Sequence, residues 1–575
     1  MSSVPRPVVE KVRTLSHDPT LRRRMVVVSL ALNFLVIFLV RRGWVSHLLT
    51  ALWILSIVSF CLSAIERPRF RLPRWRPTRQ SLLVVAIVLL PAIVRVAHMA
   101  TGRIHGDELL TAYFSKTHDF RHTSFFTPMP DRGEWVSQFP TPFYLLQRWF
   151  LDIAGASVAA VRLSTLPYVV IVSVLLFLIA RKLLDRSTAL VAVTLYAFFF
   201  PGVYLEVSGF MFISSTAAFL GFFYLALRNL HATGSGAAAE AGVLAGACYL
   251  TYSSGYLALP VLLAFFLFDL VRRRRFAVVR NLVTSLLGFW IVLSPFLSDT
   301  HGGESYLFQR GSQVALLTGN WSSHHDAVAR GANPLPMVWT NLVLAGKAVY
   351  RDGIGGHGGY DFGHLALLDP LAIALLVAGT IAAMFLIRSR PELLLVLLVI
   401  VASFFAGIVL TIPPPAFHRF SLAFPFLAIV MALPFFLLPR APGIPNAIRF
   451  GAVAGSLLLF ACVNEDRLAR ARLADSPSDH ERLAKFLDQR YPDRTLYVAA
   501  YPSYAFQKMY VFLKRPGPVR RIRSGYHSDL LERFARREKY VYVITLPEAF
   551  NSQFRAADPA GRVFDFSPEY SIFAN

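Results

Sequence analysis

The stretch Ser81 to Ala100, SLLVVAIVLLPAIVRVAHMA, has the composition of a membrane-spanning helix. Its length is about that of the roughly 20 apolar residues needed to cross a bilayer. Two adjacent carboxylates, Asp107 and Glu108, follow shortly after it, directly behind Gly106. Carboxylates at the mouth of a membrane span are costly to place, so they indicate a functional site as readily as a solvated loop pair.

The rest of the chain repeats this alternation of apolar segments and polar breaks. Of its 575 residues, 55% are hydrophobic and only 16% are charged, whereas soluble domains are about a quarter charged. The sequence therefore predicts a polytopic α-helical membrane protein. It predicts about thirteen spans, at 25–40, 43–65, 81–100, 158–180, 187–204, 209–227, 238–253, 256–271, 281–298, 366–387, 392–411, 419–438 and 450–464.

The formal net charge of +24 arises from basic clusters that lie between spans, as in Arg22-Arg23-Arg24 and Arg272 to Arg275. This distribution follows the positive-inside rule and argues against nucleic acid as a partner. It predicts a multi-pass protein of the cell (inner) membrane with a cytoplasmic N-terminus. The loops 101–157 and 299–365 and the tail then lie outside, and only the short Arg41-Arg42 loop conflicts with this orientation.

The tail has a higher charge density and a different periodicity from the spans. Residues 478–481, Ser-Asp-His-Glu, fit a capping box that opens a helix to about Gln489. Residues 495–499 and 540–544 are typical of buried strands, and 528–537 of a further helix. We therefore expect three regions: 1–80 with two extra spans, a catalytic membrane domain over 81–464, and a small α/β domain outside the membrane over 465–575.

The outer loops contain most of the chemically interesting side chains. His105, Lys116 and Arg121 belong to the first long loop, and His418-Arg419 precede a late span. Arg419 suits either an interfacial anchor or an anion-binding role. Arg95 lies within a span and should therefore face a protein-lined or watery cavity. Glu206 shares the outer rim or is a simple loop carboxylate. The histidines of the second long loop match no standard metal-ligand spacing.

Several segments together resemble the GT-C membrane glycosyltransferases, which include protein O-mannosyltransferases and lipid A aminoarabinose transferases. They are Phe139-Pro-Thr-Pro-Phe-Tyr-Leu-Leu, Leu151-Asp-Ile-Ala-Gly-Ala-Ser, Val161-Arg-Leu-Ser, Leu244-Ala-Gly-Ala-Cys-Tyr-Leu-Thr, and His418-Arg419-Phe420 with Pro425. Gly106-Asp107-Glu108 stands where that family keeps its acidic motif. The resemblance covers about 81 to 438. It departs from the family in Pro140-Thr141-Pro142, in Ser164-Thr165, and in the two preceding spans.

The resemblance implies transfer of a sugar from a polyprenyl-phosphate donor to a lipid, glycan or protein acceptor at the outer face. Asp107 would be the general base and Glu108 would orient the acceptor or support Asp107. The donor phosphate would be bound first by Arg419, and then by Lys116, Arg121 and Arg95. His105, Glu206 and His418 are further site candidates. A single displacement would invert the anomeric centre.

No cofactor is required by the sequence, although a divalent metal held by Asp107 and Glu108 is left open. The main alternative is a transporter or flippase of lipid-linked sugars. Such a protein usually shows repeat symmetry or matched Gly/Pro-broken spans, and we find neither in the sequence. A non-catalytic scaffold of envelope assembly, which would use the tail to bind partners, is the third reading.

Overall fold

The structure is a computed structural model. It describes residues 19–44, 46–64, 78–99, 104–118, 126, 142–230, 235–273, 276–298, 300–301, 304–319, 322, 324–354, 360, 362–412, 415–438, 445–473, 479–499, 509–514, 519–522, 540–544, 562–567 and 570–574. Arg121 and the helix expected at 528–537 lie outside these residues.

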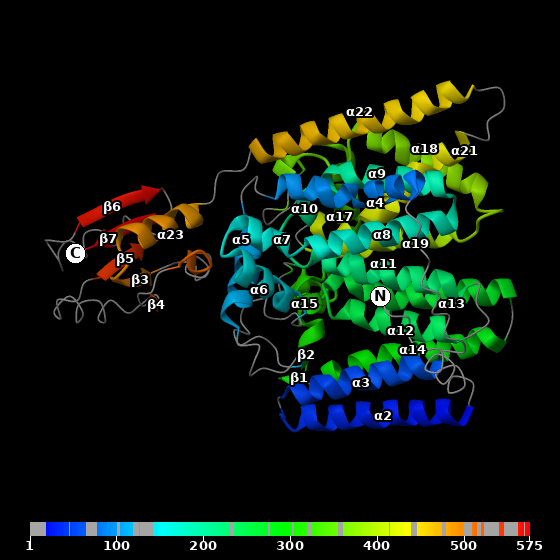
Figure 1. Ribbon diagram of the computed structural model, residues 1–575, viewed down its shortest axis with the longest axis horizontal. Helices are drawn as coiled ribbons and strands as arrows, with labels where there is room; N and C mark the ends of the chain where they lie inside the picture. The colour runs from blue at the N-terminus through cyan, green and yellow to red at the C-terminus, as the bar shows by residue number, and fades with distance from the viewer. Residues whose placement is uncertain are drawn as a thin grey trace.

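Long helices lie side by side in one bundle and account for most of the described chain (Figure 1). Each apolar segment predicted from the sequence coincides with one of these helices or with a broken helix. They are α2 (Pro19–Arg41), α3 (His47–Ala64), α4 (Arg79–His98), α7 (Val158–Leu163) with α8 (Leu166–Leu183), α9 (Arg186–Phe198) with α10 (Phe200–Glu206), α11 (Phe212–Asn229), α12 (Gly236–Tyr249), η2 (Ser253–Leu257) with α13 (Ala258–Arg273), α14 (Phe276–Ser298), α18 (Pro370–Leu386), α19 (Leu393–Phe404) with η4 (Phe405–Val409), α20 (Phe417–Phe420) with η5 (Ser421–Ala423) and α21 (Phe424–Leu437), and α22 (Asn446–Leu473).

Within the described residues, fewer membrane spans are supported than the predicted thirteen. Eight helices within the described residues are long and apolar enough to cross a bilayer, or nine if α9 and α10, bent by 61°, form one span. Among the other predicted spans, α12 has 14 residues, α18 has 17, and α19 has 12 before the π-helical turn η4. The protein is a multi-pass membrane protein, and its exact number of spans stays a prediction.

The centre of the bundle is the segment Phe417–Leu437, which is the most buried candidate span. Small residues allow the helix backbones around it to approach closely. A Cβ on Gly379 of α18 would lie 2.0 Å from the carbonyl oxygen of Val430, and one on Gly242 of α12 would lie 2.0 Å from that of Ser285. Neither glycine can carry a side chain without separating these helices.

The helix α22 runs along one edge of the bundle, opposite α2 and α3 (Figure 1). It is the least buried candidate span. It continues to Leu473, beyond the predicted end at residue 464, because Arg467 and Asn464 on its inner face are anchored to the body of the protein by contacts with Asp369. The predicted boundary of the tail at residue 465 therefore falls inside a helix.

One end of the bundle bears short helices and a small hairpin. They are α5 (Gly106–Thr117), α6 (Pro142–Ala154), α15 (Tyr306–Val314), α16 (His325–Ala329), α17 (Leu335–Tyr350), η3 (Phe362–His364) and the strands β1 (Thr300–His301) and β2 (Glu304–Ser305). The helix α6 is amphipathic, with Trp149 and Ile153 exposed. These elements come from the two long loops, which thus meet at the same end of the molecule.

The C-terminal segment lies beyond this end (Figure 1). It contains α23 (Asp479–Arg490) and a five-stranded sheet of order β4-β3-β5-β7-β6. The strand β3 (Thr495–Ala499) pairs in parallel with β4 (Val519–Ile522) and β5 (Tyr540–Ile544), and β7 (Tyr570–Ala574) is antiparallel to β5 and β6 (Arg562–Ser567). Both β3 and β5 have the bounds predicted from the sequence, because each is an apolar run flanked by polar residues.

Candidate active site

The two carboxylates that follow the third predicted span lie in the first turn of α5. His105 caps this helix: its Nδ1 accepts a hydrogen bond from the Asp107 backbone N–H at 3.1 Å. Glu108 accepts reciprocally from the His105 N–H at 2.9 Å. Negative side chains are favoured at a helix N-terminus because they face the unsatisfied N–H groups there. Adjacent positions nevertheless place Asp107 and Glu108 in different surroundings.

Glu108 is fully committed to an internal ion pair. Its side chain and that of Arg162 are 2% and 5% exposed, with 3.0 Å between Oε2 and Arg162 Nε. The Gly209 backbone N–H also donates to Oε2, at 2.8 Å. Of the two roles that the sequence offers for Glu108, supporting Asp107 agrees better with these contacts than orienting an acceptor. Its hydrogen bonds join α5, α7 and the loop before α11.

Asp107 is more accessible, with 23% of its side chain exposed. Its Oδ2 accepts a hydrogen bond from the Tyr360 hydroxyl at 3.1 Å and lies 3.6 Å from Nδ1 of His105. Burial raises the pKa of Tyr360 well above its ordinary value, and the charges of Asp107 and Glu108 raise it further. The Tyr360 hydroxyl therefore stays protonated and donates to the Asp107 carboxylate, which stabilises the charged form of that carboxylate.

Four rings, Phe212, Tyr252, Tyr360 and His418, form an aromatic cluster beside Asp107. The Tyr360 ring lies 5.2 Å from Phe212 and 4.8 Å from His418, and Phe212 lies 4.9 Å from Tyr252. The ring of His105 lies 4.1 Å from that of Tyr360 and extends the cluster to α5. The first long loop, the second long loop and the segment that begins α20 therefore meet here, and both candidate histidines, His105 and His418, contact Tyr360.

Arg419 follows His418 directly and is buried, with 5% of its surface exposed. Its Nη1 donates to the Ile412 carbonyl at 2.8 Å, and the Tyr252 side chain is a second partner. Its Nε has no hydrogen-bond partner among the described residues. The π-helical turn η4 seats the Arg419 backbone, since a Cβ on Gly407 would lie 2.6 Å from the Arg419 carbonyl oxygen. A buried guanidinium with an unused N–H is suited to receive an anionic oxygen.

The other cations expected at a donor phosphate have different partners. Arg95 is 0% exposed and forms a 2.8 Å ion pair with Glu206, and its Nη1 donates to the Ala197 carbonyl at 2.5 Å. Glu206 also accepts from the Tyr196 hydroxyl at 2.6 Å. Arg95 and Glu206 thus neutralise each other within the bundle. Lys116 donates to backbone carbonyls of the C-terminal segment, so the structure does not place either cation at an open phosphate site.

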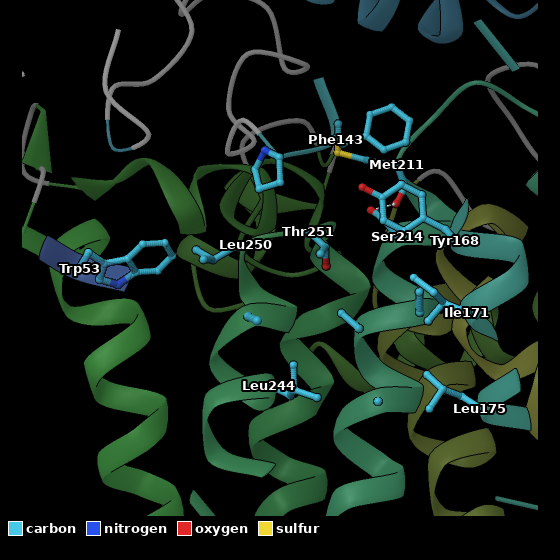
Figure 2. A pocket seen from close by; sticks show the side chains of 15 residues that line it. Trp53, Phe143, Tyr168, Ile171, Leu175, Met211, Ser214, Leu244, Leu250 and Thr251 are labelled. Carbon is cyan, nitrogen blue, oxygen red and sulfur yellow. Dashed lines mark hydrogen bonds between the residues drawn. The ribbon is translucent and has the colours of Figure 1, made fainter. Parts of the chain in front are cut away.

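An apolar groove of about 560 Å³ opens beside the aromatic cluster. Figure 2 shows Phe143 and Met211 at its upper end, Trp53 on one side, and Ile171 and Leu175 on the other. Met211 and Thr251, which line it, directly precede Phe212 and Tyr252 of the aromatic cluster. Two residues of the groove lining are therefore direct chain neighbours of two rings of the aromatic cluster.

Metal binding has little support in this geometry. No group of three His, Cys, Asp or Glu side chains suitable for a metal ion occurs within the part of the chain that the structure describes. Glu108, one of the two ligands that the sequence leaves open for a metal, already uses its oxygens on Arg162 and backbone N–H groups. These contacts do not favour a metal held by Asp107 and Glu108 together.

Sequence reasoning missed Tyr360, Tyr252 and Arg162 as residues of the site. Arg162 carried a signal, because a cation at the start of an apolar span requires a partner. The only sequence signal for Tyr252 was its position at the outer end of a predicted span. Tyr360 had no usable signal, since it lies 253 residues from Asp107 in a long loop rich in polar residues.

Comparisons with known proteins find structures with a similar fold and a family model that matches a central segment of the sequence. Residues 139–298 match the family model of dolichyl-phosphate-mannose-protein mannosyltransferases. The solved structure of ArnT from Cupriavidus metallidurans bound to undecaprenyl phosphate has 14% identity and a TM-score of 0.56, and the match covers 87% of this chain and 98% of that one. Its apo form has 13% identity and a TM-score of 0.53, with coverage of 86% and 98%.

A third solved structure, the apo oligosaccharyltransferase from Archaeoglobus fulgidus, has 14% identity and a TM-score of 0.49, covering 82% of this chain and 71% of that one. None of the curated protein sequences matches this chain. The ArnT match shows that most of this chain follows an architecture already known among membrane proteins.

Proposed function

Because this chain has the fold of the GT-C membrane glycosyltransferases and their sequence pattern over residues 139–298, we propose that it transfers a sugar from a polyprenyl-phosphate donor to an acceptor hydroxyl. The reaction takes place at the outer face of the cell (inner) membrane. The observation that carries this proposal is the aromatic cluster, which connects the accessible Asp107 carboxylate to the buried Arg419 beside an apolar groove.

In the proposed reaction, Asp107 takes the proton of the acceptor hydroxyl as its oxygen attacks carbon one of the sugar. The bond between that carbon and the phosphate oxygen breaks, and its electron pair leaves with the polyprenyl phosphate. Arg419 balances the charge on the departing phosphate, for which its unused Nε–H is suited. A single displacement without a protein nucleophile inverts the configuration of the anomeric carbon. No metal ion is needed for any of these steps.

The apolar groove is the proposed seat of the isoprenoid chain of the donor. A lipid donor reaches the site sideways from the bilayer, and Ile171 at the groove is 45% exposed. Burial of each methylene group contributes about 0.8 kcal/mol, so even a few isoprene units add substantially to binding. Most of the lining side chains are apolar, and the polar groups among them include the hydroxyls of Tyr168, Ser214 and Thr251, which makes the groove better suited to a lipid chain than to a free sugar.

The proposal is tested by supplying a labelled polyprenyl-phosphate sugar, with either a long or a short isoprenoid chain, to purified protein in lipid nanodiscs. Ala218→Phe fills the groove and is expected to reduce kcat/KM for the long-chain donor by about 10-fold or more, the effect of losing burial of two or three methylene groups. The short-chain donor should be affected much less. Release of polyprenyl phosphate, followed by mass spectrometry, is the measurement.

The control variant is Ile381→Phe, which adds a ring to a half-exposed position of α18 outside the groove. It should leave both donors unaffected. If Ala218→Phe reduced kcat/KM equally for the long-chain and short-chain donors, the groove would not be the binding site of the isoprenoid chain. Movement of intact lipid-linked sugar across the membrane without sugar release would favour the flippase alternative. If the protein neither transferred nor moved the sugar, the non-catalytic scaffold would be the remaining hypothesis.

Arg419→Ala is expected to raise the KM for the donor by about 10- to 100-fold, since a charge-assisted hydrogen bond contributes about 1.5–3 kcal/mol. Arg272→Ala is the matched control, because Arg272 forms an ion pair with Glu392 and its side chain is 48% exposed. Donor titrations of both variants check the prediction. An unchanged donor KM in folded Arg419→Ala would contradict the phosphate-binding role.

A further inference from the structure

The helix α5, which bears Asp107, is packed between two different cores. Leu110 and Phe114, one helical turn apart, belong to the core of the membrane bundle. Leu109 and Ala112, on another face, belong to a second core that they share with Val511 and other residues of the C-terminal segment. The C-terminal segment therefore does more than cover this end of the bundle, since it completes the packing of the proposed catalytic helix.

Lys116, in the last turn of α5, bonds directly to that segment. Its Nζ donates to the carbonyl oxygens of Tyr510 at 3.2 Å, Val511 at 2.9 Å and Leu513 at 3.0 Å. An ammonium has three N–H donors, and these three carbonyls match them in number. Residues 509–513 form a short helical turn, in which Met509 and Tyr510 accept from Phe512 and Leu513. A lysine suits such an end because cationic side chains donate hydrogen bonds to the last carbonyls of a helical turn.

Aromatic and charged contacts reinforce this junction. The Lys116 Nζ lies 5.4 Å from the centre of the Tyr510 ring, which makes an edge contact with Tyr113 of α5 at 5.7 Å. Arg148 of α6 donates to the Lys116 carbonyl and so joins the same junction. Burial lowers the pKa of Lys116, and the charge of Asp488 opposes this change. The ammonium is thus partly buried and is held by the C-terminal segment.

We infer that the turn 509–513 of the C-terminal segment clamps α5 through Lys116 and thereby sets the position of Asp107. Lys116 is a positioning residue in this arrangement, because it contacts the segment and not the reacting atoms. This inference rests on the proposed function for its catalytic consequence, but the clamp itself is a physical statement about α5. A shift of the base by a fraction of an ångström would affect the proton transfer and leave donor binding intact.

The test is Lys116→Met in the full-length protein in nanodiscs, with Lys116→Arg as the conservative variant. Lys116→Met should reduce kcat by about 10- to 100-fold, the cost of misplacing a reacting group by up to 1 Å. The donor KM should change less than about two-fold. Lys116→Arg retains the cationic N–H donors and should recover part of kcat. Hydrogen–deuterium exchange of the amides in 109–116 should accelerate in Lys116→Met.

Lys485→Met is the matched control, because Lys485 belongs to the same segment and its side chain is 67% exposed. Neither kcat nor exchange in α5 should change in that variant. Unaltered exchange in α5 of Lys116→Met would overturn the clamp, whether or not the protein is a transferase. Faster exchange together with an unaltered kcat would overturn the positioning role. If Lys116→Met fails to fold, Tyr510→Leu weakens the same junction and gives the same readouts. Absence of transfer in the wild-type protein counts only against the proposed function.

Discussion

Asp107→Asn should lower kcat for sugar transfer by about 10²- to 10⁴-fold, the contribution typical of a general base. An asparagine amide cannot take the acceptor proton at neutral pH. Its oxygen can still accept the Tyr360 hydrogen bond, which Asp107 now accepts at 3.1 Å. The hydrogen bond from the backbone N–H of residue 107 to His105 Nδ1 does not involve the Asp107 side chain and is retained. We therefore expect a folded, inserted protein with near-normal donor affinity and almost no turnover, measured with labelled donor.

Asp326→Asn is the matched control for this substitution. Asp326 lies in the first turn of α16, as Asp107 does in α5, but it is exposed and belongs to another loop helix. Both variants lose the same favourable charge at a helix N-terminus, which is worth about 0.3–1 kcal/mol. Only Asp107→Asn should lose activity. Turnover of Asp107→Asn near the wild-type rate would eliminate Asp107 as the base and leave the proposed mechanism without one.

The different fates of Asp107 and Glu108 show what the sequence could reveal about this site. Their position after an apolar span was enough to mark the pair as unusual. The sequence could not show that Arg162, 54 residues away, neutralises one member and leaves the other accessible. A site residue can be chosen from a motif, but its protonation and accessibility depend on partners brought together by the tertiary fold.

The cations of the predicted donor site make the same point. Lys116 and Arg95 were chosen because a positive charge near the outer face suits a phosphate. In the fold, Arg95 is paired with Glu206 and Lys116 with three carbonyls. Among the described residues, the Arg419 Nε–H has no hydrogen-bond partner. The order of the helices was predictable from hydropathy, whereas helix ends such as that of α22 depend on polar contacts that hydropathy does not report.

Glu108→Gln is expected to destabilise the protein by about 3–5 kcal/mol, the usual cost of removing one partner from a buried ion pair. The side chain of Arg162 is 5% exposed, so its charge would be left in a low-dielectric site without a counter-charge. A glutamine also offers one carbonyl oxygen where Glu108 now accepts from Arg162, His105 and Gly209. Unfolding midpoints in mild detergent, followed by tryptophan fluorescence, measure the loss.

The double variant Glu108→Gln with Arg162→Met tests whether the unpaired charge of Arg162 causes the loss of stability. It removes the stranded charge and should recover part of the stability lost in the single variant, because the penalty comes chiefly from the unpaired guanidinium. Glu481→Gln is the control: its ion pair with Lys485 spans one helical turn, and Lys485 is largely exposed, so the expected loss is at most about 0.5 kcal/mol. If Glu108→Gln unfolded at the wild-type midpoint and lost only activity, Glu108 would belong to the chemistry and not to the support of α5.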